Sequence, residues 1–177
     1  MVHLWIDVAK MSSNNVEKMP EISVLMPVYN ADKYIGTAVE SILEQTFTDF
    51  EFIIINDGST DGTLAILDTY AKQDNRIRLV SRENKGLVAT LNEGVGLVKS
   101  PLVARMDADD ISLPDRFEKQ VSYLAGHSNC VALGGRSLII DPEGDEMCVW
   151  NQLTTFDEIQ NQHLNTFLGS AVAHPSM

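Results

Sequence analysis

The sequence predicts an α/β fold with a mostly parallel sheet flanked by helices, and three observations support this prediction. Short apolar runs alternate with patterns of helical period from residue 22 onwards, up to a fourth run at residues 102–106. The first run, at residues 22–28, is continuous rather than alternating, as expected of a strand buried on both faces. The 177 residues are 44% hydrophobic, which suits one globular domain.

Strand–helix–strand units of this kind favour right-handed crossovers, with helices on both faces of the sheet. The strands are expected at residues 22–28, 50–55, 77–80 and 102–106. Apolar residues at helical spacing indicate three helices between them. Their apolar faces are Ile35, Ala38, Val39, Ile42 and Leu43, then Leu64, Leu67, Tyr70 and Ala71, then Leu87, Val88, Leu91, Val95 and Val98. Thr60 or Asp61 is placed to cap the second helix.

The alternation ends at about residue 110, and a different arrangement is expected beyond it. A helix that begins near Pro114 comes first, followed by a hairpin with strands at residues 130–140 and 147–150. Cys130 and Cys148 are interpreted as small hydrophobic residues within these two strands. The hairpin region therefore completes the sheet-based part of the predicted domain.

Both ends of the chain carry further expectations. Residues 1–20 are polar and without period after a short apolar start, so they are expected to be an extension to a domain at residues 21–177. Thr155 and Glu158 form a capping-box pattern, and residues 167–173 are expected to form a strand.

Composition excludes several classes of function. Acidic residues outnumber basic ones, 25 to 13, and the net charge of −12 argues against a partner that is duplex nucleic acid. Two cysteines cannot form a disulfide framework, which suits a reducing compartment. No apolar run reaches the ~18 residues of a membrane span. We expect a cytoplasmic location, or one at the inner face of the membrane.

The carboxyl ends of parallel strands carry the ligand sites of open α/β sheets, so each of the four strand ends is a candidate site. The first strand ends with Pro27, Val28, Tyr29 and Asn30, without the glycine pattern of a dinucleotide site or a P-loop. Tyr29 beside a chain restricted by proline suits stacking on a base, and a surface tyrosine in a turn is an equal alternative.

The second strand ends in Asn56-Asp-Gly-Ser-Thr-Asp-Gly-Thr63, where Asp57 suits acceptance of the N–H of a pyrimidine. Ordinary turn and cap chemistry is one alternative for this segment. A calcium loop is another, since Asp57, Ser59, Asp61, Gly62 and Asp68 occupy five of its positions. It is the less favoured, because the segment follows a strand and ends in Asp.

The third strand leads to Arg82 and Lys85 at the start of a helix, where backbone N–H groups favour a pyrophosphate. Taken alone this pattern is weak, and solvated charges are the favoured interpretation. The fourth strand leads to Asp107, Asp109 and Asp110, three carboxylates that suit Mg²⁺ or Mn²⁺. An ion pair of Asp107 with Arg105, or an acidic helix start without metal, would also explain this cluster.

Four motifs in this order resemble glycosyltransferase family 2, which has the GT-A fold. They are Pro27-Val-Tyr-Asn30, Asn56-Asp-Gly-Ser-Thr-Asp-Gly-Thr63, Asn84-x-Gly86 with Asn92-x-Gly94, and Asp107-Ala-Asp-Asp110. The resemblance implies transfer of a sugar from a nucleotide-diphospho-sugar, commonly a UDP-sugar, with inversion, to a saccharide or lipid-linked acceptor. Peripheral contact with the membrane is compatible with such an acceptor.

The resemblance also implies residue roles. Pro27, Val28, Tyr29 and Asp57 would hold the base together with Asn30 of the same motif. Asp107 would reach the ribose, Asp109 would bind Mn²⁺ or Mg²⁺ with help from Asp107 and Asp110, and Ala108 would lie between them. Lys85 would contact the base or the diphosphate.

The departure from the family concerns the catalytic base. In the family it follows a His-Pro-x-apolar segment, which here is His174-Pro-Ser-Met177, so the catalytic residue is unknown and expected beyond Met177. Glu143, Asp145 and Glu146 match nothing in the family pattern. We expect a C-terminally incomplete, donor-binding part that is inactive alone and prone to self-association. A metal-dependent nucleotide-sugar binding module without turnover is the alternative, and a dehalogenase-type phosphatase is a distant third.

Overall fold

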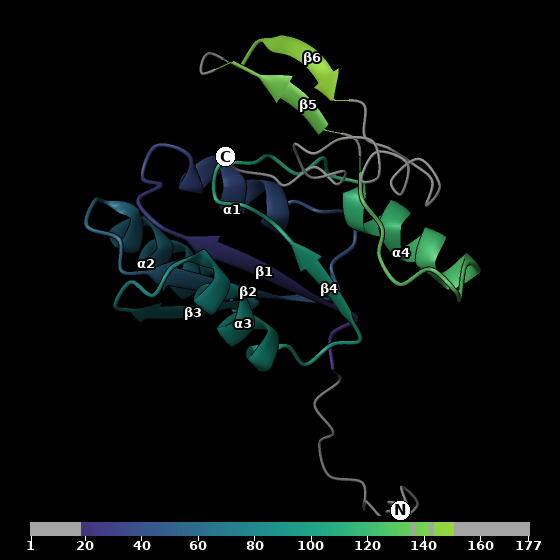
Figure 1. Cartoon of the computed structure of the whole chain (residues 1–177), viewed down its shortest axis with the longest axis horizontal. Coiled ribbons are helices and arrows are strands. Elements are labelled where there is room, and N and C mark those ends of the chain that lie inside the picture. The colour runs from purple at the N-terminus through teal and green to yellow at the C-terminus, as the bar shows by residue number, and fades with distance from the viewer. Residues whose placement is uncertain (1–18, 136, 142–143, 151–177) are drawn as a thin grey trace, which may run out of the picture.

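The computed structural model describes residues 19–135, 137–141 and 144–150 of the chain. Its main feature is a four-stranded parallel sheet in the order β3-β2-β1-β4 (Figure 1). The strands are β1 (Ile22–Val28), β2 (Phe50–Asp57), β3 (Ile77–Arg82) and β4 (Leu102–Arg105). All four predicted strands are therefore confirmed, and β2 runs two residues further than expected, so that it includes Asp57.

Helices cover both faces of this sheet, as predicted (Figure 1). Helices α1 (Ile35–Leu43) and α2 (Thr63–Gln73) pack on one face, in the larger core cluster, and α4 (Arg116–Gly126) joins them through Phe117. Helix α3 (Leu87–Leu97) packs on the opposite face against β1 and β2. The expected α/β architecture with crossover helices is confirmed.

Strand β1 lies at the centre of the core. All seven of its residues are buried, which agrees with its near-continuous apolar sequence. Val24, Met26 and Val28 point to the face of α1 and α2, and Leu25 points to the face of α3. The two-residue period of a strand thus supplies apolar contacts to both layers.

The predicted buried face of α3 is wrong in part. Val88 and Val95 are exposed, with relative areas of 73% and 59%, and the buried residues are Thr90 and Gly94. The reason is close approach, since a Cβ on Gly94 would stand 2.3 Å from Leu25 Cδ1. A helix that packs through a glycine rotates its contact face toward the small residue and away from the larger apolar ones.

The hairpin is confirmed but shorter than predicted. Strands β5 (Ser137–Ile140) and β6 (Glu146–Trp150) pair antiparallel, apart from the main sheet (Figure 1). Cys148 lies in β6 and is exposed, whereas Cys130 lies before β5 and outside any strand, which corrects its assignment. The Cys130 thiol donates to the Ala132 carbonyl in an irregular segment instead.

Several expectations lie outside the described residues. They are the extension before residue 19, Glu143, the capping box of Thr155 and Glu158, the strand at 167–173, and the segment His174-Pro-Ser-Met177. Within the part that is described, no helix combines the length and the apolar character needed to cross a bilayer.

Candidate functional site

A pocket of about 370 Å³ opens at the carboxyl edge of the parallel sheet, where β1 and β4 are neighbours. The chain passes from β1 to β2 to β3 in one direction and then returns to the other side of β1 with β4. Such a switch point leaves a crevice between the loops that follow the strands, and ligands of open α/β sheets bind there. Its lining residues are Pro27, Val28, Tyr29, Asn30, Ala31, Tyr34, Asp57, Asn84, Gly86, Leu87, Thr90, Asp107, Ala108 and Asp109.

The turn after β1 is held against the turn after β2. Asn30 adopts a φ of 50°, in the left-handed region that asparagine tolerates better than most residues. Its backbone N–H donates to Ser59 Oγ at 3.0 Å, and its side-chain oxygen accepts the Thr60 backbone N–H at 2.8 Å. Tyr29, which precedes it, is 54% exposed at the pocket. The turn geometry thus fixes the backbone on both sides of this aromatic ring.

The start of α2 contacts the same turn, but the predicted capping of this helix by Thr60 or Asp61 is wrong, because Gly62 is the N-cap and no side chain caps the helix. Asp61 Oδ1 instead accepts the Thr63 backbone N–H at 3.0 Å from the position before the N-cap. Thr63 in turn accepts the Ala31 backbone N–H at 2.8 Å. Both bonds fix the loops that border the pocket.

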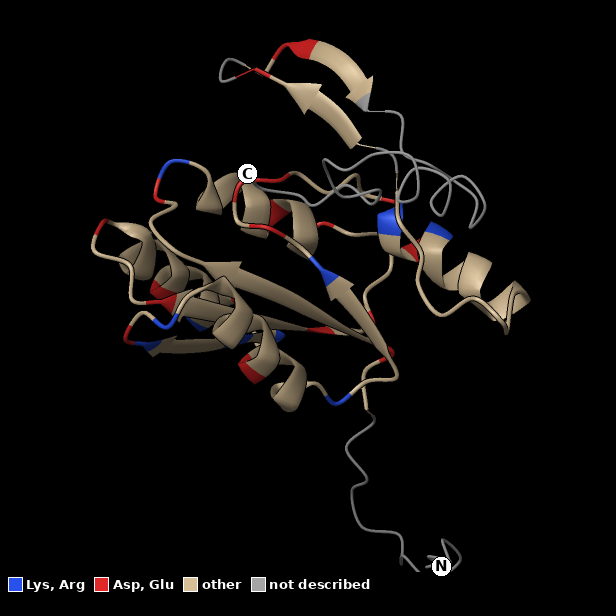
Figure 2. Ribbon diagram, in the orientation of Figure 1, with Lys and Arg blue, Asp and Glu red and all other residues tan. Residues whose placement is uncertain are grey.

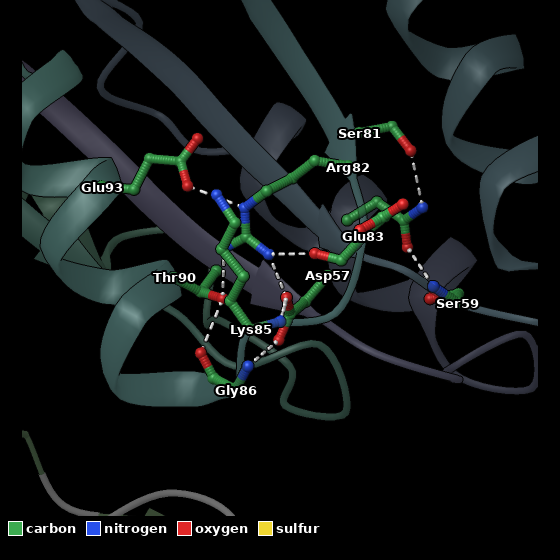
Figure 3. A network of polar contacts seen from close by, with 10 residues as sticks. Asp57, Ser59, Ser81, Arg82, Glu83, Lys85, Gly86, Thr90 and Glu93 are labelled. Atoms are coloured by element: carbon green, nitrogen blue, oxygen red, sulfur yellow. Dashed lines mark hydrogen bonds and ion pairs between the residues drawn. The ribbon is translucent and has the colours of Figure 1, made fainter.

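Asp57 stands at the centre of a polar network between β2, β3 and α3 (Figure 3). Its Oδ1 atom accepts from the Arg82 guanidinium and from the Lys85 backbone N–H at 2.8 Å. Its Oδ2 atom accepts the Gly86 backbone N–H at 2.9 Å. Asp57 and Arg82 are direct partners in the β2–β3 register, so the strand pairing itself brings them together.

This network keeps the Asp57 carboxyl ionised. Burial alone would raise the pKa of Asp57, but the Lys85 N–H and the Arg82 guanidinium outweigh it and hold that pKa below its usual value. A carboxylate can accept about four hydrogen bonds, and the network supplies three donors to Asp57. One Oδ2 position therefore remains for a ligand in the pocket.

Arg82 has a different role from the one its sequence position indicates. A solvated charge was favoured there, with a pyrophosphate contact as the weaker option, yet the Arg82 side chain is mostly buried. Its guanidinium binds Asp57, Glu93 Oε2 at 2.7 Å and Thr90 Oγ1 at 2.8 Å. The Lys85 and Gly86 N–H groups at the start of α3 are likewise directed to Asp57. These groups orient the Asp57 carboxylate and are not directed at a phosphate.

The acidic segment after β4 contains three carboxylates in different environments. Asp107 is buried and pairs with Arg105 at 3.0 Å, so basic and acidic residues meet where β4 ends (Figure 2). Burial, together with the Asp107 and Asp109 carboxylates, raises the pKa of Asp110. Asp109 is exposed at the pocket and makes no hydrogen bond or ion pair with any described residue.

The carboxylates after β4 suit a divalent cation that is also coordinated by oxygen atoms of a substrate. The described residues contain no group of three or more His, Cys, Asp or Glu side chains that could hold a metal alone. Mg²⁺ in nucleotide sites is typically held by one or two carboxylates and by substrate phosphates, not by an all-protein cage. Asp109 fits that pattern best, because Arg105 already neutralises Asp107.

Gln45 fixes the segment that follows these carboxylates. This buried side chain donates from Nε2 to the Leu113 carbonyl at 2.7 Å and to Ser112 Oγ at 3.2 Å. Its Oε1 atom accepts the Phe117 backbone N–H at 3.1 Å. The C-terminal end of α1 therefore anchors the loop between β4 and α4.

The structure brings eight of the nine predicted binding residues to one pocket. The exception is Lys85, whose side chain is exposed and is not part of the lining, although its neighbours Asn84 and Gly86 are. Tyr34 and Thr90 line the pocket and were not predicted. Neither follows a strand end, so only the packing of α1 and α3 reveals them.

The calcium-loop interpretation is wrong. Asp57 ends β2, and its oxygens accept from Arg82, Lys85 and Gly86 and not from a shared cation site with Asp61 or Asp68. Asp68, the last position of that loop pattern, lies exposed within α2. These carboxylates are therefore not arranged around a common cation.

Comparison with known proteins gives a consistent result. A family model described as Glycosyl transferase family 2 matches residues 23–175. A curated relative from Haemophilus influenzae, described as an uncharacterized glycosyltransferase, is 43% identical over 126 residues, which cover 71% of this chain and 39% of the relative. The chain therefore spans less than half of that relative's length.

Two solved structures share the fold. S. aureus TarS 1-349 in complex with UDP-GlcNAc matches with a TM-score of 0.57 at 22% identity, over 68% of this chain and 40% of that one. The mannosyltransferase PcManGT from Pyrobaculum calidifontis, in complex with GDP-Man and Mn²⁺, matches with a TM-score of 0.58 at 24% identity, over 72% of this chain and 37% of that one. The predicted GT-A fold is confirmed.

Proposed function

Since this chain belongs to glycosyl transferase family 2, we propose that its pocket binds a nucleotide-diphospho-sugar, most favourably a UDP-sugar, for transfer to an acceptor hydroxyl with inversion. One observation carries the proposal: the turn after β1, Asp57 and the Asp107–Asp109 carboxylates line one pocket at the switch point of the sheet. A base, a ribose and a diphosphate need an aromatic surface, a polar acceptor and a cation site, and this pocket offers all three.

Each group has a role that its environment supports. Tyr29 is exposed beside Pro27 and suits stacking on the base, while the ionised Asp57 accepts a ring N–H. Asp107, buried and held by Arg105, suits a fixed hydrogen bond to the ribose. Ala108 between the two carboxylates leaves room for the sugar nucleotide. Lys85 remains a proposed contact of the base or diphosphate from outside the pocket lining.

Mn²⁺ or Mg²⁺ is the proposed cofactor, with Asp109 as its main protein ligand. When bound, such a cation offsets the negative charge that develops on the leaving diphosphate. Asp109 is available for this role because it has no partner among the described residues. The complex of PcManGT with GDP-Man and Mn²⁺ supports the choice of ion class.

The acceptor side is supported less directly. Among the described residues, the carboxylates that line the pocket are Asp57, Asp107 and Asp109, and each has a donor-side role. A general base missing from its position typically lowers the rate by ~10²–10⁴-fold. The described residues therefore also support a second candidate function, metal-dependent binding of a nucleotide-sugar without turnover.

A binding screen and a turnover assay together test the proposal. UDP-, GDP- and dTDP-sugars are titrated into the chain with Mn²⁺, and UDP-sugars are expected to bind most tightly. Donor hydrolysis is then compared between this chain and a version extended beyond Met177. Binding in both with turnover only in the longer chain supports a donor-binding part of a transferase, and binding of none of the three nucleotide classes would contradict the proposal.

A further inference from the structure

Arg82 lies one layer behind the pocket and touches it only through another residue. It is absent from the pocket lining, whereas Asp57, its ion-pair partner, is part of that lining. The Arg82 side chain is itself mostly buried, with a relative exposure of 13%. A residue in this position affects a ligand through the lining residues that it contacts, Asp57 and Thr90, and of these Asp57 carries the charge.

Both sides of the Arg82 guanidinium are anchored (Figure 3). Nε donates to Glu93 Oε2 at 2.7 Å, one terminal nitrogen donates to Thr90 Oγ1 at 2.8 Å, and the other donates to Asp57 and to the Glu83 carbonyl. The Thr90 hydroxyl in turn donates a hydrogen bond to the Gly86 carbonyl at 2.9 Å. The planar fork of arginine holds these partners in a rigid arrangement, and lysine would keep the charge but not all of the contacts.

We propose that Arg82 is a positioning residue that sets base selection, because it holds Asp57 as an ionised acceptor. An ionised carboxylate can only accept hydrogen bonds. It therefore pairs with bases that present a ring N–H, such as uracil, and it opposes cytosine, whose ring nitrogen presents a lone pair at the same place. The inference rests on the proposed function, since it takes Asp57 as the contact to the base.

Loss of the Arg82 charge should change the kind of base that is accepted, and not only the affinity. Without Arg82, burial, which raises the pKa of Asp57, is opposed by fewer groups, chiefly the Lys85 backbone N–H, so the neutral form becomes more accessible. A protonated carboxyl group carries an O–H donor and can pair with the ring nitrogen of cytosine. The preference for UDP over CDP should then shrink, an effect that a purely structural role of Arg82 would not produce.

The test measures dissociation constants of UDP and CDP, with Mn²⁺, for wild type, Arg82→Met, Arg82→Lys and Arg78→Met. Wild type should prefer UDP by at least about tenfold, the value of one hydrogen bond to a charged group. Arg82→Met should reduce this ratio to within about threefold, and Arg82→Lys, which keeps the charge, should restore most of it. Arg78→Met is the matched control, because Arg78 is exposed on the same strand, and its ratio should equal that of wild type.

Circular dichroism and urea unfolding establish that each variant is folded. If Arg82→Met does not fold, Glu93→Ala carries the test, because it removes an anchor of Arg82 and leaves the buried pair with Asp57 in place. Its UDP/CDP ratio should fall about two- to threefold, a fraction of one hydrogen bond. Equal loss of UDP and CDP affinity with an unchanged ratio would overturn the inference and leave the proposed function standing, whereas a wild-type chain that binds neither nucleotide would overturn both.

Discussion

Gly94 of α3 lies directly against Leu25 of β1, and a Cβ added to Gly94 would stand 2.3 Å from Leu25 Cδ1. Leu25 is buried and cannot move aside without disturbing the α3 face of the sheet. This contact sets the distance between α3 and the sheet. It therefore sets the position of the residues at the start of α3 that surround Asp57.

Gly94→Ala should destabilise the protein by about 1–2 kcal/mol, since overpacking costs more than the helix propensity that alanine adds. Gly96→Ala is the matched control, because a Cβ at Gly96 meets nothing within 4 Å. It should be neutral or stabilise by up to about 1 kcal/mol. Urea unfolding of both variants measures the difference, and equal stabilities would contradict the packing argument.

Gly58→Ala should disturb the site more than its conformation alone explains. Gly58 has a φ of +72°, and a Cβ there would stand 2.5 Å from the Asn84 backbone nitrogen. Gly144→Ala is the matched control, because Gly144 also has a positive φ, +93°, but a Cβ there would meet nothing within 4 Å. It therefore measures the conformational cost alone, about 1–2 kcal/mol. Gly58→Ala should lower the free energy of unfolding by more than Gly144→Ala does, and it should also weaken UDP binding. Calorimetry measures that affinity. A wild-type affinity for UDP would contradict the prediction and show that the Asn84 loop tolerates displacement.

Gln45→Met should destabilise the chain by about 2–4 kcal/mol, because buried polar groups lose their partner. The groups affected are the Leu113 carbonyl and the Phe117 N–H. The same change should weaken Mn²⁺-dependent donor binding, since Gln45 anchors the segment that follows the acidic cluster. Gln73→Met, at an exposed position of α2, is the control and should change neither property.

Asp57 should contribute stability that depends on pH in a defined direction. Its folded pKa lies below the ordinary value of 3.8, so its contribution is complete above that value and is lost as the pH falls through the lower, folded pKa. The difference in unfolding free energy between wild type and Asp57→Asn should therefore shrink as the pH is lowered from neutral to acid. A difference that stays constant down to full acid unfolding would show that Asp57 is not a stabilised carboxylate.

Asp109→Asn should weaken donor binding mainly through the metal, and excess Mn²⁺ should partly restore it. One carboxylate contact to a divalent ion changes affinity by about tenfold or more. Asp68→Asn, an exposed carboxylate of α2, is the control and should leave the metal dependence unchanged. Asp57→Ala should respond differently, with a loss that excess Mn²⁺ does not rescue. Equal rescue of both variants would contradict the separation of base and metal roles.

Periodicity was sufficient to predict the parallel sheet and its helices. The apolar run of β1 and the face of Ile35, Ala38, Val39 and Ile42 on α1 are buried as expected, because strand and helix periods follow from backbone geometry. The face of α3 could not be predicted in this way. Its contact depends on the absence of a side chain at Gly94, and an apolar count gives glycine no weight.

The candidate site, too, could be predicted only in part. Residues at strand ends, such as Asp57 and Asp109, were predictable because the topology places all carboxyl ends at one edge. The role of Arg82 was not, since its pairing with Asp57 depends on the β2–β3 register and on the position of α3 behind it. Gln45 was missed for a similar reason, because its partners lie about 70 positions away in sequence, a separation of 67 for Ser112 and 72 for Phe117.

The central claim is that these residues form a metal-dependent donor site, and titration of UDP by calorimetry tests it most directly. The protein is titrated once with Mn²⁺ and once with EDTA at equal ionic strength. The account predicts saturable binding of one UDP per chain with Mn²⁺, weakened at least about tenfold in EDTA by loss of the cation between Asp109 and the diphosphate. Equal affinity in the two titrations, or no binding in either, would contradict it.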